Sequence, residues 1–443
     1  MAMSRQLPAL LDAAWSRAGN PPLCVALSGG PDSTVLLHAL ASVRGTQRSL
    51  RAVHVDHGLH PDSTSWARGC EQQCAVLGVD LEIIRVEVHK RGEGIEAAAR
   101  AARYAALARA IRAGEWLVTA HHREDQAETV LLKLMRGAGP HGLGAMRERR
   151  ALGKGQLWRP LLDTDRAMLE AYALATGLTA IDDPANRDPL LARSFLREDI
   201  LPRLATHWPH AARTLAQAAR MQQVQAAWID RHARAAVRDM LAADGSLHAD
   251  GWVSGDLAVR PRVLELWLHG QGLDAPGQAQ REELERQIRT SAPDRVPCVC
   301  WPGVEIRLWR RHLHAMRPLP EIAAHWHAPW KGDELQLPVG RLYWESDGSI
   351  ECAGKPRPEL EVRLQVPGLR LRPYGDRHER RLCTLFQQAG VPPWQRRFCP
   401  LLYDANGILL AVADLWTTES GQHAFAEVGA RPRWMRDNVI RAR

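Results

Sequence analysis

The strongest constraint on the fold is a regular alternation of short apolar runs with helical patterns in the first part of the chain. Four apolar runs have the length of strands and lie at 23–27, 50–55, 81–88 and 115–120. The segments between them, at 32–43, 63–77 and 95–112, have the length and pattern of helices. Strands that alternate with helices form a parallel sheet covered on both faces. We therefore predict a doubly wound α/β domain that binds its ligand beyond the carboxyl ends of the strands.

The remainder of the chain changes character twice. After this α/β domain, placed at 1–208, an Ala-, Gln- and Arg-rich stretch predicts a long helix to about residue 241, and we expect a mainly helical domain over 209–318. The Pro-rich segment 319–359 shows no clear periodicity and is interpreted as a linker. An alternating strand, a helix followed by glycine and a hairpin pattern then predict a small α+β domain over 360–443.

Charge and composition narrow the range of partners. Lys and Arg number 58 against 50 Asp and Glu, and this net charge of +8 favours a polyanionic partner such as a nucleic acid. No apolar run approaches the roughly 18 residues of a membrane span, so we predict a cytoplasmic protein with no membrane partner. The eight cysteines are dispersed without paired C-x2-C spacing and are interpreted as reduced and structural.

The segment with the clearest chemistry is a glycine-containing loop between the first strand and the first helix. Two glycines allow close backbone approach, Pro31 favours the first helical turn, and the helix N-terminus attracts an anion. The loop lacks both the lysine of the Walker motif and the spacing of a dinucleotide-binding motif. An ordinary turn capped by Asp32 or Ser33 is the alternative. The predicted phosphate-binding residues are Ser28, Gly29, Gly30, Pro31, Asp32 and Ser33.

This loop resembles the S-G-G-x-D-S pyrophosphate loop of the N-type ATP pyrophosphatases, which activate a carbonyl oxygen by adenylation. The resemblance implies ATP as cosubstrate, with the loop around the departing pyrophosphate and with Asp32 supporting Mg2+. Such an arrangement neutralises the negative charge that develops on the leaving group. Asp56 and His57, which follow the second strand, are further expected ATP-binding residues.

A second motif lies at 120–129, A-H-H-R-E-D-Q-A-E-T, and resembles the A-H-H-x-D-D-Q-x-E-T signature of the tRNA(Ile) lysidine synthetases. Helical spacing places Asp125 and Glu128 on one face, where two acids can hold an ammonium group. Two alternatives stay open: acids that only complement the helix dipole, and His121 with His122 as metal ligands. Glu124 departs from the family, which has Asp at this position.

Further matches to the same family extend over most of the chain, strongest over about 22–205. Other departures from the family pattern are His60, where Arg is usual, and Ser194, where Asn is usual. The additional matching segments are VDHGL at 55–59, LMRG at 134–137, WRPLL at 158–162, DPANRD at 183–188 with Arg193 and Arg197 after it, and 386–402.

The resemblance implies a reaction that joins free L-lysine to the wobble cytidine of tRNA(Ile) with a CAU anticodon. Cytosine O2 attacks the α-phosphate of ATP, and the lysine ε-amine then displaces AMP at C2, so adenylation activates the base first. The expected catalytic residues are Asp32, Asp125, Glu128 and Arg193, and the last three form the expected lysine pocket. For Arg193 and Arg197 a solvated helix face is the alternative.

Basic and aromatic residues late in the chain fit a tRNA surface, and scattered solubilising charge is the alternative. Rival functions are a tRNA thiolase with the same loop, which would need reactive cysteines, and a non-catalytic RNA-binding protein with a nucleotide-binding fold. A homodimer is the assembly we would test first. The predicted tRNA-binding residues are Arg372, Arg377, Arg380, Arg381 and Trp394.

Overall fold

The computed structural model describes residues 3–58, 60–88, 95–181, 191–292, 295–323, 325–346, 357–364 and 366–436. The chain divides into two compact units, Met1–Trp228 and Ile229–Arg443. Their boundary falls inside the long helix α10 (Ala211–Met240), some way beyond the domain end expected near residue 208. The matching segment 183–188 lies outside the described residues.

The first unit is built on a six-stranded sheet with the order β3-β2-β1-β4-β6-β5. All neighbouring strands are parallel except β5, which runs antiparallel to β6 at the edge. The predicted doubly wound parallel sheet is confirmed. Its strands are β1 (Leu23–Ala26), β2 (Leu50–Asp56), β3 (Asp80–Arg85), β4 (Trp116–Val118), β5 (Arg149–Leu152) and β6 (Gly155–Trp158).

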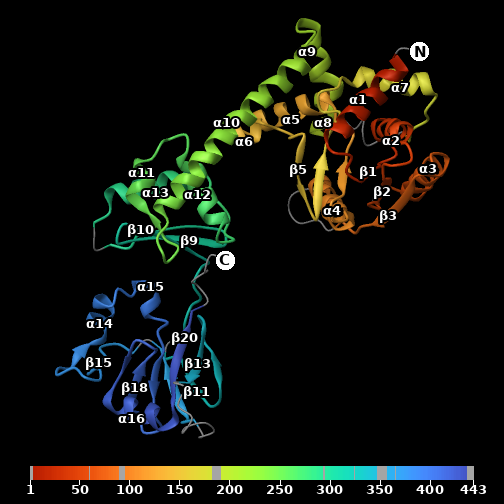
Figure 1. Ribbon diagram of the computed structural model, residues 1–443. Helices are drawn as coiled ribbons and strands as arrows, with labels where there is room; N and C mark the ends of the chain where they lie inside the picture. Colours follow the sequence, from red (N-terminus) through yellow and green to blue (C-terminus); the bar gives the residue numbers. More distant parts are fainter. Residues whose placement is uncertain are drawn as a thin grey trace. The chain divides into compact units, whose positions relative to one another are not determined.

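Helices cover both faces of this sheet (Figure 1). One apolar core joins β1 and β2 to α1, α2, α3 and α7, and a smaller one packs α4 against the opposite face. This arrangement places the amino end of α2 and of α5 at the carboxyl edge of the sheet. The helices are α1 (Met3–Arg17), α2 (Pro31–Val43), α3 (Ser63–Val76), α4 (Ile95–Ala110), α5 (Arg123–Met135), α6 (Pro140–Leu143), α7 (Arg166–Thr176), α8 (Ala192–Phe195), a π-helical turn η2 (Leu196–Ile200) and α9 (Leu201–His207).

The second unit begins with helices, as expected, but they pack on a four-stranded antiparallel sheet, which the sequence pattern does not predict. Buried Trp252 and Trp267 lie in the core between helices and sheet. No described helix, α10 included, combines the length and apolar character needed to cross a membrane. The elements are α11 (Ala249–Ser254), α12 (Arg260–His269), α13 (Gln278–Thr290), β7 (Leu247–His248), β8 (Cys298–Trp301), β9 (Val304–Trp309) and β10 (His312–Met316).

The rest of the second unit is a set of small antiparallel sheets with short helices, in agreement with the predicted α+β architecture. The predicted hairpin is present as β17 paired with β18. The elements are β11 (His327–Trp330), β12 (Glu334–Gln336), β13 (Arg341–Ser346), β14 (Leu360–Arg363), β15 (Arg370–Leu371), β16 (Arg380–Arg381), α14 (Leu382–Gln388), α15 (Pro393–Arg396), β17 (Leu401–Tyr403), β18 (Leu409–Val412), β19 (Trp416–Thr417), α16 (Glu419–Val428) and β20 (Ala430–Met435).

The interpretation of 319–359 as a linker is wrong for its described residues. Strand β11 pairs with β14, and β13 pairs with β20 along its whole length. The physical reason is visible in β13, where Leu342 and Trp344 point into the core while their neighbours are more exposed. The segment is therefore part of the C-terminal sheets. Its Pro329 lies inside β11, which is an edge strand, where a proline is tolerated.

Candidate active site

The loop between β1 and α2 has a backbone that only glycine fits at its second position. Gly29 has φ +84°, and a Cβ there would lie 2.4 Å from Cδ1 of Ile181. Gly30 is the N-cap residue of α2, and Pro31 occupies the first turn. The chain thus turns sharply from the sheet into the helix, as the motif predicts.

Two serine hydroxyl groups hold this loop in shape. The Oγ atoms of Ser28 and Ser33 lie 3.0 Å apart, and Ser33 Oγ donates a hydrogen bond to the Gly30 carbonyl at 3.0 Å. The backbone N–H of Ser28 donates to Ser33 Oγ at 3.2 Å. Because the first N–H groups of a helix lack intrahelical partners, the start of α2 has donors and a preformed backbone that suit an anion.

A cavity of about 550 Å3 opens beside the loop, a volume that suits a nucleotide-sized ligand. Its wall brings together residues from the carboxyl ends of β1, β2 and β4 and from α4, α5 and α8. Seven of the residues predicted to bind ATP or lysine line this one cavity, whereas Gly29, Gly30, Pro31 and Glu128 are not part of its lining. Those among its lining are Ser28, Asp32, Ser33, Asp56, His57, Asp125 and Arg193.

His57 and Asp56 lie at the end of β2. Asp56 Oδ1 accepts the backbone N–H of Gly58 at 2.9 Å, which fixes the turn after the strand. Nδ1 of His57 is buried and has no hydrogen-bond partner among the described residues. Burial lowers the pKa of His57, so this ring is neutral at pH 7 and can bind a polar group of a ligand.

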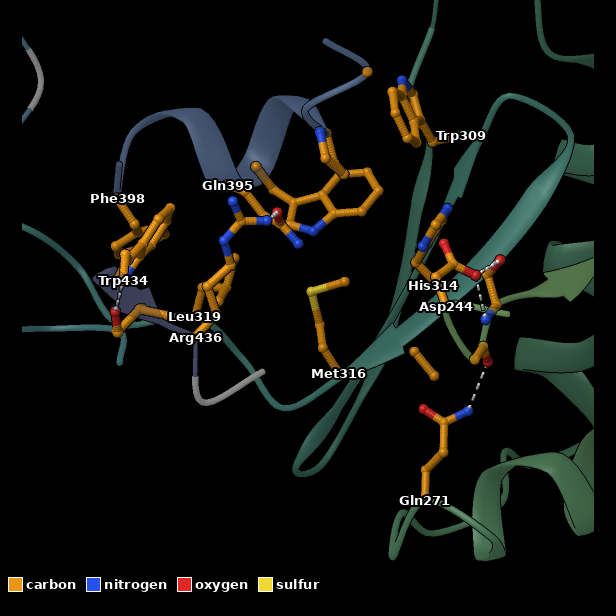
Figure 2. Close-up of a pocket in the computed structure, with 17 residues that line it drawn as sticks. Asp244, Gln271, Trp309, His314, Met316, Leu319, Gln395, Phe398, Trp434 and Arg436 are labelled. Carbon is orange, nitrogen blue, oxygen red and sulfur yellow. Dashed lines mark hydrogen bonds between the residues drawn. The ribbon is translucent and has the colours of Figure 1, made fainter. Parts of the chain in front are cut away.

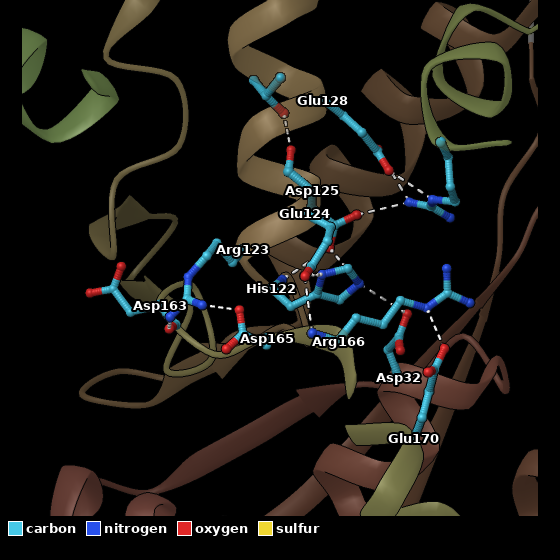
Figure 3. Close-up of polar contacts among 12 residues, drawn as sticks. Asp32, His122, Arg123, Glu124, Asp125, Glu128, Asp163, Asp165, Arg166 and Glu170 are labelled. Carbon is cyan, nitrogen blue, oxygen red and sulfur yellow. Dashed lines mark hydrogen bonds and ion pairs between the residues drawn. The ribbon is translucent and has the colours of Figure 1, made fainter. Parts of the chain in front are cut away.

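His122 is the centre of the acidic cluster at the start of α5 (Figure 3). Its Nδ1 lies 2.9 Å from Glu124, and its Nε2 lies 3.4 Å from Asp125 and 3.6 Å from Asp32. Burial opposes the charged ring, but the hydrogen bonds to Asp32 and Glu124 and the charge of Asp125 outweigh it and raise the pKa of His122 to about 10. A buried imidazolium therefore ties the pyrophosphate loop to α5.

Glu124, the acid that departs from the family pattern, has a structural role here. Its Oε2 atom accepts from Nδ1 of His122 at 2.9 Å and from the backbone N–H of Arg166 at 3.0 Å. The longer side chain thus joins the start of α5 to the start of α7. It is not among the residues that line the ATP-sized cavity.

The two acids expected to hold lysine are bound by Arg197, whose role the sequence analysis left open. Nε of Arg197 donates to Glu128 at 2.7 Å, and its Nη2 donates to Asp125 at 3.0 Å and to the second Glu128 oxygen at 3.2 Å. Glu128 is fully buried, whereas Asp125 lines the cavity. Burial raises the pKa of Glu128 and Arg197 opposes the rise without cancelling it.

Arg193 lies in the same cavity and extends toward α5. Its Nη2 donates to Oγ1 of Thr129 at 3.2 Å, and its neighbour Ser194 is buried. His121 forms another part of the wall, with Nδ1 2.8 Å from Oγ1 of Thr119. Burial lowers the pKa of His121 to about 3, so it is neutral. The solvated-face alternative for Arg193 and Arg197 is wrong, since both contact α5.

Asp32 is the position expected to support Mg2+, and its surroundings fit a site completed by the nucleotide. Its carboxylate lines the cavity and is about one-third exposed. Within the described ranges no group of three His, Cys, Asp or Glu could hold a metal ion by itself. Because Mg2+ is usually held by one or two carboxylates together with phosphates and water, Asp32 with ATP is a suitable donor set.

Comparisons with known proteins agree with this geometry. Residues 2–204 match the PP-loop domain, 247–314 the TilS substrate binding domain and 360–438 the TilS substrate C-terminal domain. The chain is 43% identical to the tRNA(Ile)-lysidine synthase of Xanthomonas campestris over 93% of this chain and 95% of that protein. The chain belongs to the tRNA(Ile)-lysidine synthase family. The family resemblance and the enzyme class predicted from the motifs are confirmed.

A second lysidine synthase is also similar over most of the chain. The tRNA(Ile)-lysidine synthase of Yersinia pseudotuberculosis is 36% identical over 93% of this chain and 96% of that protein. Among solved structures, the U34-tRNA thiolase NcsA from Methanococcus maripaludis has a TM-score of 0.43 and 18% identity, covering 50% of this chain and 80% of that chain. The identity to the lysidine synthases extends through both compact units.

The arginines expected to bind tRNA differ in their surroundings. Arg372 pairs with Glu419 at 2.8 Å, and Arg380 pairs with Asp376. Arg377 and Arg381 are exposed. The exposed pair is therefore better placed to meet an RNA phosphate than the two arginines that already have a carboxylate partner.

Trp394 does not present an open stacking face, because it is buried against aromatic rings. Two of these rings, Trp309 and His314, lie at the pocket shown in Figure 2. The ring centre of Trp394 lies 5.1 Å from that of His314 and 5.9 Å from that of Trp309. The three rings line a cavity of about 220 Å3 in the second unit. A role for Trp394 in binding RNA stays a prediction.

Proposed function

We propose that this protein ligates free L-lysine to C2 of the wobble cytidine of tRNA(Ile) with a CAU anticodon, with ATP as the activating substrate. One observation carries the proposal: a single cavity joins the anion-binding loop at Ser28–Ser33 to Asp125 on α5. Membership in the tRNA(Ile)-lysidine synthase family supports the choice of substrates. The products are lysidine, AMP and pyrophosphate.

In the first step, cytosine O2 attacks the α-phosphorus of ATP, and the bond to pyrophosphate breaks. The N–H groups at the start of α2 and the shaped loop stabilise the charge on the departing pyrophosphate. Mg2+ held by Asp32 would neutralise phosphate charge when bound. His122 keeps Asp32 oriented, because its cationic ring lies 3.6 Å from that carboxylate.

In the second step, the neutral ε-amine of lysine attacks C2, and the bond from C2 to the adenylate oxygen breaks to release AMP. Asp125 is the acid that faces the cavity, so we assign it to a lysine amino group. Arg193, on the same wall, is suited to the lysine carboxylate. Glu128 is enclosed, and we assign it the task of positioning Arg197 and thereby Asp125.

The thiolase alternative would need a reactive cysteine near the loop. Cys70 is the nearest described one, since its Sγ would lie 3.1 Å from a Cβ at Gly29. Burial raises the pKa of the Cys70 thiol to about 12, and that of Cys74 to about 11. Both are protonated and enclosed, which makes them poor nucleophiles or cluster ligands. Lysine transfer is therefore the better supported chemistry.

The proposal is tested by incubating the protein with ATP, lysine and tRNA and measuring AMP and pyrophosphate. We expect AMP release to require both lysine and a tRNA(Ile) with a CAU anticodon, and the modified cytidine to carry one lysine by mass spectrometry. AMP release that needs sulfur donor instead of lysine would indicate a thiolase, and no ATP turnover would indicate a binding protein. Methionine tRNA with the same anticodon is the matched control.

Assembly and location are separate predictions. We expect a homodimer, which sedimentation of the full chain tests directly. We also expect the protein in the cytoplasm, where its tRNA substrate is found, and fractionation of cells tests this.

A further inference from the structure

A second pocket, of about 370 Å3, adjoins the ATP-sized cavity on the side of α4. The two cavities share Arg100 and Tyr104. None of the described residues that line this second pocket carries a carboxylate, and four of the seven are arginines. We call it the arginine pocket, and its lining is Arg100, Tyr104, Ala145, Met146, Arg147, Arg150 and Arg159.

The arginines are arranged around one aromatic ring. The guanidinium carbon of Arg100, on α4, lies 5.2 Å from the ring centre of Tyr104, and that of Arg150, on the edge strand β5, lies 5.1 Å from it. These are cation–π distances, so the ring holds two cationic groups near each other. Arg149, the preceding residue on β5, points elsewhere and lies over Trp116. Strand alternation therefore directs Arg150 toward the pocket.

Arg159 forms the base of the pocket and is the strongest sign of a missing ligand. It is only 4% exposed, and its Nη1 donates to the Arg147 carbonyl at 2.7 Å. Its Nε is buried without a hydrogen-bond partner among the described residues. A buried cation normally has a compensating charge and satisfied donors, because leaving either out is costly. A bound anion would supply both.

The neighbouring groups respond to this excess of positive charge. Burial alone would raise the pKa of the Tyr104 hydroxyl, yet Arg100 and Arg159 outweigh burial and the pKa is lowered. Burial also lowers the pKa of Arg159; the interaction with Tyr104 opposes this decrease, and Arg150 and Arg100 add to it. The geometry and the charges thus agree that the pocket lacks a negative partner.

We propose that the arginine pocket binds a backbone phosphate of the substrate RNA next to the nucleotide that is modified. This inference rests on the proposed function, which requires an RNA base beside ATP. The pyrophosphate of ATP already has its own anion site at the start of α2, so a second anion site in the connected cavity serves the other phosphate-bearing substrate. Guanidinium groups bind phosphate oxygens in pairs, as Arg100 and Arg150 could.

The test compares the full chain with Arg100→Gln and Arg150→Gln, and Arg149→Gln is the matched control on the same strand. For each pocket variant we expect tRNA affinity to fall about fivefold to tenfold and the log–log salt slope of binding to decrease by about 0.7, the value for one single-strand phosphate contact. The same loss should appear with an RNA hairpin that contains only the anticodon arm. The control should match the wild type. For Arg150→Gln, which does not line the ATP-sized cavity, KM for ATP should stay within about twofold.

Arg159→Lys keeps the charge at the base of the pocket but removes the fork, and its folding is checked by thermal melting. A folded variant with weakened RNA binding supports the assignment. If the pocket variants instead raise KM for ATP and leave RNA affinity and salt slope unchanged, the anion is the triphosphate and the proposal is overturned. It is also overturned if the loss is seen with whole tRNA but not with the anticodon-arm hairpin.

These outcomes are separable from failure of the proposed function. If the wild-type protein shows no lysine-dependent AMP release, the function is wrong whatever the variants do. If the wild type is active and Arg100→Gln and Arg150→Gln behave like Arg149→Gln, the function stands and the arginine pocket has no role in RNA binding.

Discussion

Arg197 holds Glu128 through two hydrogen bonds, from Nε to Oε1 at 2.7 Å and from Nη2 to Oε2 at 3.2 Å. The same Nη2 also reaches Asp125 at 3.0 Å, so one guanidinium fixes both acids of α5. Because Glu128 is fully buried, its charge depends on this partner. The pair thus decides where Asp125 points: Glu128 is enclosed, whereas Arg197 and Asp125 both line the cavity.

Removal of the Arg197 guanidinium should therefore destabilise the fold. For Arg197→Met we expect the free energy of unfolding to fall by about 3 kcal/mol, because a carboxylate would stay buried without a partner. Glu128→Gln should raise KM for lysine more than KM for ATP. Urea unfolding and lysine-dependent AMP release measure the two effects. In the variant that combines Arg197→Met with Glu128→Gln, the loss in unfolding free energy should be smaller than the sum of the two single losses. Full additivity would contradict the coupling between these residues.

The buried His122 cation gives a pH dependence of known sign. Its pKa is about 10 in the folded state against an ordinary value near 6.5, so the folded protein binds one more proton between these limits. The contribution of this charge to the free energy of unfolding is complete below about pH 6.5 and is lost as the pH rises to about 10. Its upper limit is about 5 kcal/mol.

The measurement is urea unfolding of the wild type and of His122→Asn at several pH values from 6 to 10. The difference in unfolding free energy between the two should shrink as the pH rises. A constant difference over this range would show that His122 is not charged in the folded protein.

The backbone at Gly29 predicts a sharp contrast between neighbouring glycines. Gly29→Ala places a methyl group 2.4 Å from Ile181 at a positive φ, whereas at Gly30 the nearest atom to a new Cβ is 3.4 Å away. We expect Gly29→Ala to displace the loop by about 1 Å and thereby to lower the rate of pyrophosphate release about a hundredfold. Gly30→Ala should lower the rate of pyrophosphate release clearly less. Equal losses would mean that close approach of phosphate, not the loop's shape, sets the requirement for glycine.

Substitution of Asp32 should slow the adenylation step without changing tRNA binding. For Asp32→Asn we expect pyrophosphate release to fall by about 10²–10³, because the carboxylate supports the charge on the leaving group. Fluorescence titration should give tRNA affinity within about twofold of the wild type. A near-normal rate of pyrophosphate release would remove Asp32 from the catalytic set.

The parts of this fold that the sequence predicts are those encoded by neighbouring residues. The first four strands of the first unit are visible as apolar runs, whereas the hairpin of β5 and β6 is not. The loop at Gly29 and Gly30 is a local motif between a strand and a helix. The acids at Asp125 and Glu128 follow from helical spacing. In each case residues a few positions apart determine the structure, so a sequence pattern is sufficient.

The parts that the sequence does not predict depend on contacts between distant residues. Arg197 is 69 residues from Glu128, and nothing local identifies it as that acid's partner. Strand β13 pairs with β20 about 90 residues later, so short strands between prolines resemble a linker until their partner is known. Trp394 was expected at a surface, and only the packing of Trp309 and His314 shows that it is enclosed.

The last prediction concerns the exposed arginines Arg377 and Arg381 in the second unit. If they meet tRNA phosphates, the double variant with Gln at both positions should weaken tRNA binding and decrease the log–log salt slope by about 1.4 to 1.8, since each lost contact removes about 0.7 to 0.9. Arg372→Gln is the matched control, because this arginine is already paired with Glu419 and should change the slope less. Substitution is preferable to truncation at residue 357, which would remove β14, the partner of β11, and β20, one of the two partners of β13. ATP binding should be unchanged in all variants, because the ATP cavity is formed by the first unit alone. Equal slopes for the double variant and the wild type would show that these arginines serve only to keep the surface charged.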